Sequence, residues 1–270
     1  MQVNPRQPDD SVNVSKTHPL VEGGLLLGGI GVIFITVTAV IVFAVDLLVR
    51  FVPPEKEVKW LSNWSPMEVE IEDTPTQRQL TALLERMSRH YDTDYRFRIG
   101  IDESKVPNAM ALPGGLIVVT QGLLDAVETE NELAFVIGHE LGHFAERDHL
   151  RQLGRIAALV VMFAGVSSSG GGGDVGLGLS EVTLRSFNRE QEARADAFGL
   201  SLLHAEYGHV TDAGAFFTRI AEDSDSLSAY FGTHPAPDDR VDTLLESARQ
   251  NGWAVDGQVT RWVTEPDIED

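Results

Sequence analysis

The sequence predicts a mainly helical α+β domain with a small antiparallel sheet, preceded by one N-terminal transmembrane helix. The transmembrane helix follows from an uncharged run of 21 residues, Leu25 to Val45. Stretches at residues 95–99 and 115–120 have the pattern of short strands. Helical periodicity is clearest in residues 74–91, where one stripe carries Leu80, Leu83, Leu84 and Met87.

The apolar run is long enough to cross a lipid bilayer. At about 1.5 Å per residue, a helix of this length spans about 30 Å, the thickness of the hydrocarbon layer. Glu22 and Asp46 bound the run. A secretory signal peptide has a shorter apolar core, of about 7–15 residues, and a cleavage site that the sequence after Asp46 lacks. A buried core helix is the alternative, but a run that is apolar on every face favours an uncleaved anchor.

The composition excludes several classes of site and partner. The formal net charge of −20 argues against a nucleic-acid partner, because phosphates would be repelled. The chain has no cysteine, which excludes disulfides, iron–sulfur clusters and thiolate zinc sites. Any metal must therefore be held by nitrogen and oxygen ligands. The sequence carries no indication of the oligomeric state.

The chain divides into five segments by composition. Within the central segment, helices are expected at residues 131–151, 180–204, 211–221 and 237–249, and a glycine-rich loop at 167–173. The segments are a disordered tail (1–24), the transmembrane anchor (25–51), an irregular charged linker (52–73), the domain with the candidate metal site (74–250) and an acidic tail (251–270).

Residues 139–143 read His-Glu-Leu-Gly-His, the most informative stretch of the chain. Four residues make about one helical turn, so that His139 and His143 can converge on one metal ion, with Glu140 near a water bound to it. Two imidazoles and a carboxylate suit a hydrolytic zinc site. The alternative is a surface helix with chance histidines. Apolar neighbours at 133–137 instead indicate a buried helix, where ionisable groups cost free energy unless they are paired or bound to metal.

A catalytic zinc site needs a third protein ligand and an open position for water. His149 lies six residues beyond the His-Glu-Leu-Gly-His segment and would point off its metal face, and His204 and His209 lie near a helix end. Glu192 shares a helix face with Asp196, which could accept a ring N–H from a ligating histidine. A solvated charged helix face is the alternative, and spacing alone leaves both interpretations open.

Four ordered elements resemble a known family. The 139–143 segment, followed by the distant Glu-Ala-Arg-Ala-Asp at 192–196, resembles the HtpX-type and BepA-type membrane-associated zinc metallopeptidases. The same family contains the CAAX prenyl endopeptidases. Pro-Asn-Ala-Met-Ala-Leu-Pro-Gly-Gly at 107–115 is similar to the family's segment before the active-site helix. Thr-His-Pro at 233–235, with Arg240, resembles its late His-Pro…Arg element.

The resemblance, which covers residues 74–245, implies a gluzincin metallopeptidase domain. It implies one Zn2+ per chain, held by His139, His143 and Glu192. Glu140 would be the general base, and Asp196 would orient a ligating histidine.

The resemblance also implies roles outside the metal ligands. An edge strand beside the cleft would bind extended peptides through its backbone, and it carries Asn108, Ala109, Met110 and Ala111. The alternative is that the following Pro-Gly-Gly only makes a hairpin turn. His234 and Arg240 would approach the site as a switch or as stabilisers of the oxyanion, or would be an ordinary loop histidine and helix salt bridge.

The implied function is a membrane-anchored endopeptidase that hydrolyses unfolded or extended segments in membrane or envelope protein quality control. One alternative is a latent chaperone or assembly factor in which a loop histidine such as His234 fills the open zinc position. Another is a CAAX-type processor, which the single anchor disfavours.

One departure from the family pattern concerns residues 156–179. HtpX-type members carry further membrane spans between the two parts of the metal site. Here, a short apolar run and the glycine-rich loop fill that interval, as a flap or a membrane-dipping segment. A single-pass member of the bacterial inner membrane is expected. Basic residues are nearly balanced across the anchor, and the short N-terminal tail favours a periplasmic catalytic domain.

Overall fold

A computed structural model of the chain describes residues 18–61, 69, 71–156, 187–221, 230, 234 and 239–264. The chain forms two compact units, Met1–Ala44 and Val45–Asp270. The glycine-rich loop (167–173) and all but the first residue of the expected flap (156–179) lie outside the described residues, as do most of the expected N-terminal tail and the last six residues.

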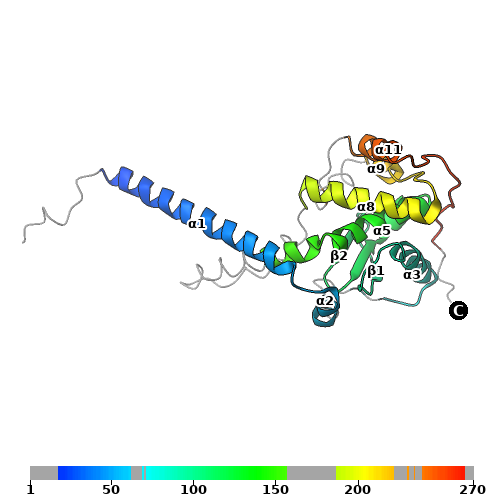
Figure 1. Cartoon of the computed structure of the whole chain (residues 1–270), viewed down its shortest axis with the longest axis horizontal. Coiled ribbons are helices and arrows are strands. Elements are labelled where there is room, and N and C mark those ends of the chain that lie inside the picture. Colours follow the sequence, from blue (N-terminus) through cyan, green and yellow to red (C-terminus); the bar gives the residue numbers. More distant parts are fainter. Residues whose placement is uncertain are drawn as a thin grey trace, which may run out of the picture. The chain divides into compact units, whose positions relative to one another are not determined.

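The N-terminal unit is dominated by α1 (Pro19–Val49), the long blue helix in Figure 1. Its most apolar 18-residue window has a mean hydropathy of 2.8, and only 6% of that window is buried. By length and composition, α1 is therefore a candidate membrane span. The prediction of one N-terminal apolar helix is confirmed.

The second unit is mostly helical, with one three-stranded sheet. Residues 148–156 also form helix. In chain order, the other elements are α2 (Pro54–Leu61), α3 (Pro75–Ser88), β1 (Arg98–Asp102), β2 (Ala109–Leu112), β3 (Leu116–Thr120), α4 (Gln121–Ala126), α5 (Glu130–Ala145), α8 (Arg189–Tyr207), α9 (Ala215–Ile220) and α11 (Arg240–Gln250).

The sheet has the order β1-β3-β2, with β2 at an edge. β2 and β3 form the expected antiparallel pair, and their hairpin turns at Gly114 and Gly115, whose φ angles of 84° and 80° favour glycine. β1 pairs with β3 in parallel. The sheet is therefore mixed. Residues 103–108 reverse the chain between β1 and β2, and the hairpin reverses it again, so that β1 and β3 run in the same direction.

Helix α5 forms the centre of the domain. Thr129 caps it by accepting a hydrogen bond from the Glu132 N–H, and every residue from Asn131 to Phe144 is buried. α3 and β2 pack against α5, and α8 lies along it (Figure 1). A helix buried on all sides holds its side chains in fixed positions, which suits it to carry a metal site.

Small residues let α5 and α8 approach closely. A Cβ added at Gly142 would lie 2.7 Å from Ala195 Cα, and one added at Gly138 would lie 3.0 Å from Gly199 Cα. Larger side chains would push the two helices apart. The side chains that project from the two helices can therefore meet across a short gap.

The segments that flank the domain are more ordered than the sequence indicated. Within the expected irregular linker, α2 forms a helix and its Glu57 is fully buried. Within the expected acidic tail, the Trp262 side chain is buried in the main apolar core, and the backbone N–H of Trp262 donates to the Glu128 carbonyl, at 2.9 Å. One residue of the linker therefore takes part in a buried ion pair, and one residue of the tail belongs to the apolar core.

Candidate metal centre

The two histidines of α5 converge on one point. His139 and His143 lie one helical turn apart, and both are fully buried. Their Nε2 atoms are 3.2 Å apart. The expected common orientation of the two imidazoles is therefore present in the fold.

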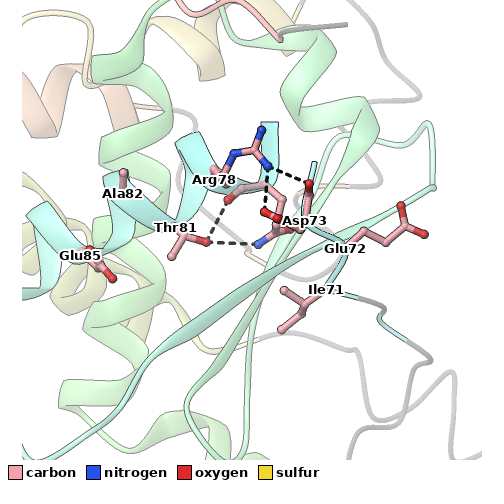
Figure 2. Close-up of a pocket in the computed structure, with 8 residues that line it drawn as sticks. Ile71, Glu72, Asp73, Arg78, Thr81, Ala82 and Glu85 are labelled. Carbon is pink, nitrogen blue, oxygen red and sulfur yellow. Dashed lines mark hydrogen bonds and ion pairs between the residues drawn. The ribbon is translucent and has the colours of Figure 1, made fainter. Parts of the chain in front are cut away.

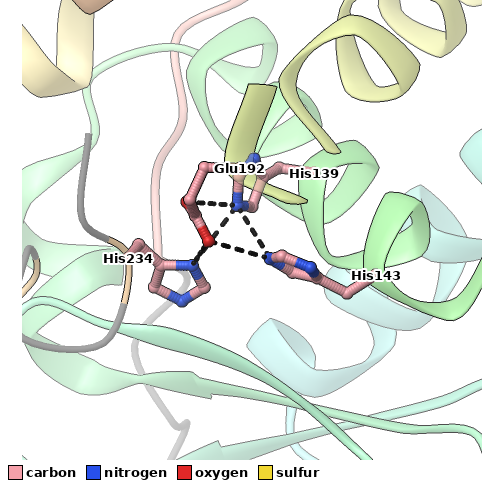
Figure 3. Close-up of side chains that lie close together, drawn as sticks. All are labelled: His139, His143, Glu192 and His234. Atoms are coloured by element: carbon pink, nitrogen blue, oxygen red, sulfur yellow. Dashed lines mark hydrogen bonds and ion pairs between the residues drawn. The ribbon is translucent and has the colours of Figure 1, made fainter. Parts of the chain in front are cut away.

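Helix α8 brings a carboxylate to the same point. Asn188 begins this helix with a capping box, and Glu192 lies in its first turn. The two Glu192 carboxylate oxygens lie 3.4 Å from the Nε2 atoms of His139 and His143. Figure 3 shows Glu192 pointing between the histidines.

A third histidine reaches the cluster from the segment before α11. His234 Nδ1 lies 3.3 Å from His139 Nε2 and 3.4 Å from a Glu192 oxygen (Figure 3). Its Nε2 donates to the Ala109 carbonyl of β2, at 3.1 Å. The candidate ligand atoms of His139, His143, Glu192 and His234 all lie within 4.8 Å of one another.

The hydrogen bonds around this cluster suit a bound cation. His139 Nδ1 faces Asp196, at 2.8 Å, and His143 Nδ1 faces Asp148, at 3.4 Å. Both Nδ1 atoms then carry the proton, so that both Nε2 lone pairs face each other. Neither oxygen of Glu192 has a hydrogen-bond partner among the described residues. Buried acceptors without donors cost free energy, and a metal ion with nitrogen and oxygen ligands would satisfy them.

The charges of the cluster shift the pKa values of its members. Burial lowers the pKa of His139, but the carboxylates of Glu192 and Asp196 outweigh burial and raise it. Burial raises the pKa of Glu192, but the neighbouring His234, His139 and His143 hold it well below its usual range. The carboxylate is therefore charged, as a metal ligand must be.

Arg240 supports this arrangement from behind His139. Its guanidinium donates to both oxygens of Asp196, at 2.6 and 2.9 Å, and its Cζ lies 3.9 Å from the centre of the Phe217 ring. It also lies 3.3 Å from His139 Nδ1, the nitrogen that faces away from the cluster. The guanidinium therefore lies on the Nδ1 side of the His139 ring, and the expected oxyanion role of Arg240 stays a prediction. In this position it orients Asp196.

Asp148 is a residue of the site that the sequence did not reveal. It is fully buried and accepts from Gln191 Nε2, at 2.5 Å, and from Arg151 Nη1, at 3.0 Å. A residue five positions after His143 would not face it on a continuous helix. The helix is interrupted at Arg147, whose φ is +61°, and this turn brings Asp148 back to His143.

The other histidines considered as third ligands lie elsewhere. His149 Nε2 donates to Glu57, at 2.8 Å. His204 stacks on Trp253, with ring centres 4.9 Å apart. His209 Nε2 donates to the Gln258 carbonyl, at 3.1 Å. All three have partners outside the cluster.

Glu140 lies on the same buried helix as the two histidines. It is fully buried, and neither of its carboxylate oxygens has a hydrogen-bond partner among the described residues. The nearest described cation or ring nitrogen is His234 Nε2, 3.7 Å from Glu140 Oε1. A buried carboxylate with free lone pairs beside a ligand cluster can accept a proton there.

The segment expected to bind substrate lies beside the cluster. β2 begins at Ala109, which is fully buried, whereas Asn108 and Met110 are half-buried. The Ala109 carbonyl is the acceptor for His234, so that it points to the edge of the sheet that no described strand covers. Ala111, two residues on, presents its backbone to the same edge.

The described hollows of the surface do not contain the cluster as a whole. A hollow of about 360 Å³ lies at the start of α3, where Arg78 donates to Asp73 (Figure 2). It contains none of the expected site residues. A smaller cavity of about 110 Å³ lies between α8 and α11, where Glu192, Asp196 and Arg240 line it. It reaches the cluster from the α11 side.

Comparison with known proteins places this geometry in a family. Metalloprotease LoiP of Escherichia coli is 33% identical over 158 residues, covering 55% of this chain and 62% of the relative. Mitochondrial metalloendopeptidase OMA1 of Schizosaccharomyces pombe is 26% identical over 174 residues, covering 63% and 50%. The beta-barrel assembly-enhancing protease of Yersinia pestis is 25% identical over 158 residues, covering 53% and 32%.

The matched region spans between about a third and three fifths of the length of these relatives. Residues 73–248 match the model of peptidase family M48, and they include every member of the His-His-Glu-His cluster. Members of this family are metal-dependent proteases, which agrees with the buried ligand cluster and the free Glu140 carboxylate. The chain belongs to peptidase family M48.

Proposed function

We propose that this chain is a membrane-anchored zinc endopeptidase that cleaves unfolded or extended protein segments. The observation that carries the proposal is the convergence of His139, His143 and Glu192 beside the unpaired carboxylate of Glu140. Three protein ligands with an adjacent general base are the parts of a hydrolytic zinc site.

The chemistry is divided between the metal and Glu140. His139, His143 and Glu192 would hold a zinc ion, which would supply the Lewis acidity that activates a water and a scissile carbonyl. Glu140 takes the proton from the attacking water and returns it to the leaving amine. Its two oxygens are free for this because no described donor holds them.

The residues behind the ligands keep the imidazoles in one orientation. Asp196 and Asp148 accept the Nδ1 protons of His139 and His143, so that each Nε2 keeps its lone pair for the metal. Arg240 holds Asp196 through two hydrogen bonds. These contacts therefore hold Asp196, His139 and His143 in the orientation that a metal site needs.

The free edge of β2 is the proposed site for the substrate backbone. An extended peptide that adds to this edge would bind through main-chain hydrogen bonds, which tolerate many side chains. The edge lies next to the cluster, since the Ala109 carbonyl contacts His234. Broad specificity for extended segments follows from such binding.

The proposed setting is a bacterial inner membrane, with α1 as a single span and the catalytic domain in the periplasm. The apolar α1 and the similarity to a protein named protease HtpX homolog support membrane association. Quality control of membrane or envelope proteins is the proposed role. Protein substrates are expected rather than nucleic acids, in view of the net charge of −20.

The proposal can be tested with the full chain in detergent micelles. Casein degradation is measured with zinc, with a chelator and for Glu140→Gln. Activity that requires zinc and is lost in Glu140→Gln supports the proposal. The proposal is contradicted if the zinc-loaded wild type and the zinc-loaded His234→Ala variant are both inert.

A second candidate function, a latent protease with chaperone or assembly activity, is favoured by the position of His234. This buried histidine places Nδ1 within 3.4 Å of Glu192 and 3.3 Å of His139 Nε2. It could occupy the position that water needs. The Ala109 carbonyl, which it also contacts, belongs to the proposed substrate edge, so that a bound peptide would compete with His234 for β2.

The two candidates differ in the effect of His234→Ala. Latency predicts an inert wild type and an active variant, whereas the open enzyme is active with His234 present. Binding of unfolded casein without cleavage in both proteins would favour the chaperone role.

The orientation of the membrane helix has a separate test. A reporter that is active only in the periplasm is fused to the C-terminal end of the sequence. An active fusion supports the proposed orientation, and an inactive but well-expressed fusion reverses it.

A further inference from the structure

A buried carboxylate outside the metal cluster joins α2 to the end of α5. Glu57 is fully buried, and its two oxygens accept from four donors. Oε1 accepts from the Gly114 N–H, at 3.0 Å, and from His149 Nε2, at 2.8 Å. Oε2 accepts from the Tyr95 hydroxyl and from Arg147 Nη2, at 3.2 Å. We call these five residues the Glu57 node.

The Glu57 carboxylate accepts hydrogen bonds at both oxygens, two at each. Burial raises the pKa of Glu57, but its bonds with His149, Tyr95 and Gly114 outweigh burial and lower it. The carboxylate is therefore charged at neutral pH. Charged groups are retained in a protein interior when their partners are fixed in place, because loss of one partner leaves an uncompensated charge.

Two arms of the node lead to the metal cluster. His149, which donates to Glu57, places Nδ1 3.3 Å from the backbone carbonyl of His143. Arg147, the other arm, has a φ of +61°, a conformation that non-glycine residues adopt rarely. Its ion pair with Glu57 holds this turn, and the next residue is Asp148, which faces His143 Nδ1.

A second contact joins the same two segments. Asp46, in the last turn of α1, accepts from Arg155 Nη2, at 2.8 Å. Arg151, one turn before Arg155, donates to Asp148, at 3.0 Å, and lies 4.0 Å from Asp46. Residues 46–57 are thus connected to residues 147–155 at two points. Asp148 and His149, which contact His143, belong to the second of these segments.

We propose that Glu57 is a positioning residue for the metal ligand His143, acting through His149 and through the Arg147 turn. Residues 46–57, which run from the last turn of α1 through the first half of α2, are then part of the support of the metal site rather than a linker. This inference rests on the proposed metal site. It predicts that a change in α2 alters metal binding although α2 contains no ligand.

The test compares zinc affinity in full-length variants in detergent, by competition with a chromophoric chelator. Glu57→Gln keeps the size of the side chain but removes the charge and half of its acceptors. Glu55→Gln, on the exposed face of α2, is the matched surface control. Glu132→Gln breaks a different ion pair of α5, in which Arg219 donates at 2.6 and 2.9 Å, and controls for lost stability.

We expect zinc affinity to fall about tenfold in Glu57→Gln, the lower end of the range for residues that support metal ligands indirectly. The visible spectrum of the cobalt-substituted protein should shift as well. Glu132→Gln should lower the melting temperature of the metal-free protein without either effect. The proposal would be overturned if Glu57→Gln had the zinc affinity and the cobalt spectrum of the wild type. It would also be overturned if Glu132→Gln lost as much zinc affinity as Glu57→Gln.

Arg147→Gly provides a test that does not depend on the folding of Glu57→Gln. Glycine adopts the positive φ without strain, so that the fold is retained while the ion pair is lost. Lower zinc affinity with an unchanged melting temperature supports the inference, and unchanged affinity contradicts it. A wild type that binds no zinc would instead reject the proposed function.

Discussion

Gly142 can be tested as the residue that sets the gap between α5 and α8. It lies between the two histidines of α5, and a Cβ at this position would lie 2.7 Å from Ala195 Cα and 3.0 Å from its carbonyl oxygen. Ordinary contacts of a Cβ begin near 3.4 Å. Gly142→Ala should therefore push the helices apart by about 0.7 Å, if the backbone rather than a side chain gives way.

This displacement is large for a metal site. Zinc–ligand distances in proteins vary by about 0.2 Å, and Glu192 is held on α8 whereas His139 and His143 are held on α5. The three ligands can no longer reach one ion with normal distances. We expect zinc affinity to fall at least about tenfold, or about 1.4 kcal/mol.

The effect on folding should be modest, because two opposing contributions partly cancel. Overpacking costs about 1–3 kcal/mol, whereas alanine in a helix gains about 1 kcal/mol over glycine. The net loss of up to about 2 kcal/mol corresponds to a melting temperature of the metal-free protein lower by at most about 8 °C in a domain of this size.

The assay combines chelator competition with thermal unfolding of the metal-free full chain. Gly28→Ala in α1 is the control, because nothing lies within 4 Å of the added Cβ there. The reasoning would be refuted if Gly142→Ala bound zinc as tightly as the wild type and melted at a higher temperature. That result would mean that only helix propensity had changed.

Three further outcomes are expected. Glu140→Gln should retain zinc affinity but reduce kcat by about 10²–10⁴-fold, measured on a fluorogenic peptide, because only the proton acceptor is lost. Asp196→Asn should lower zinc affinity about 10–100-fold by chelator competition, since a neutral amide replaces the charged acceptor of His139 and Arg240 loses its ion pair. Because the pKa of Glu57 is lowered in the fold, its contribution to stability is complete above about pH 4.5 and is lost as the pH falls through the folded value. The difference in melting temperature between wild type and Glu57→Gln should therefore shrink below pH 4.5, and a difference that grew there would contradict this sign.

The parts of the site that follow helical spacing could be predicted from the sequence. His139 and His143, four residues apart, face one point because the helix repeats every 3.6 residues. Glu192 and Asp196 have the same spacing, and the fold places both on the cluster side of α8. Spacing alone could not predict that α5 and α8 pack together at the cluster, because that packing depends on contacts between residues about fifty positions apart.

The parts that depend on a break in regular structure could not be predicted. Asp148 reaches His143 only because Arg147 adopts a positive φ, and an arginine carries no local signal for that conformation. The buried role of Glu57 was hidden for a different reason. Its helix contains four charged residues among eight and has the composition of an exposed linker. The parallel pairing of β1 with β3 likewise depends on the course of residues 103–108.

The close approach of α5 and α8 does leave a signal in the sequence, once the helices are known. Gly138 and Gly142 repeat at the spacing of one turn, and so do Ala195 and Gly199. Gly138 and Gly142 each precede a cluster histidine and Ala195 precedes Asp196, so that the helices touch where the ligands meet. The glycine within His-Glu-Leu-Gly-His is then as necessary to the geometry as the histidines, because a ligand on α8 can complete the site only if no side chain stands between the helices.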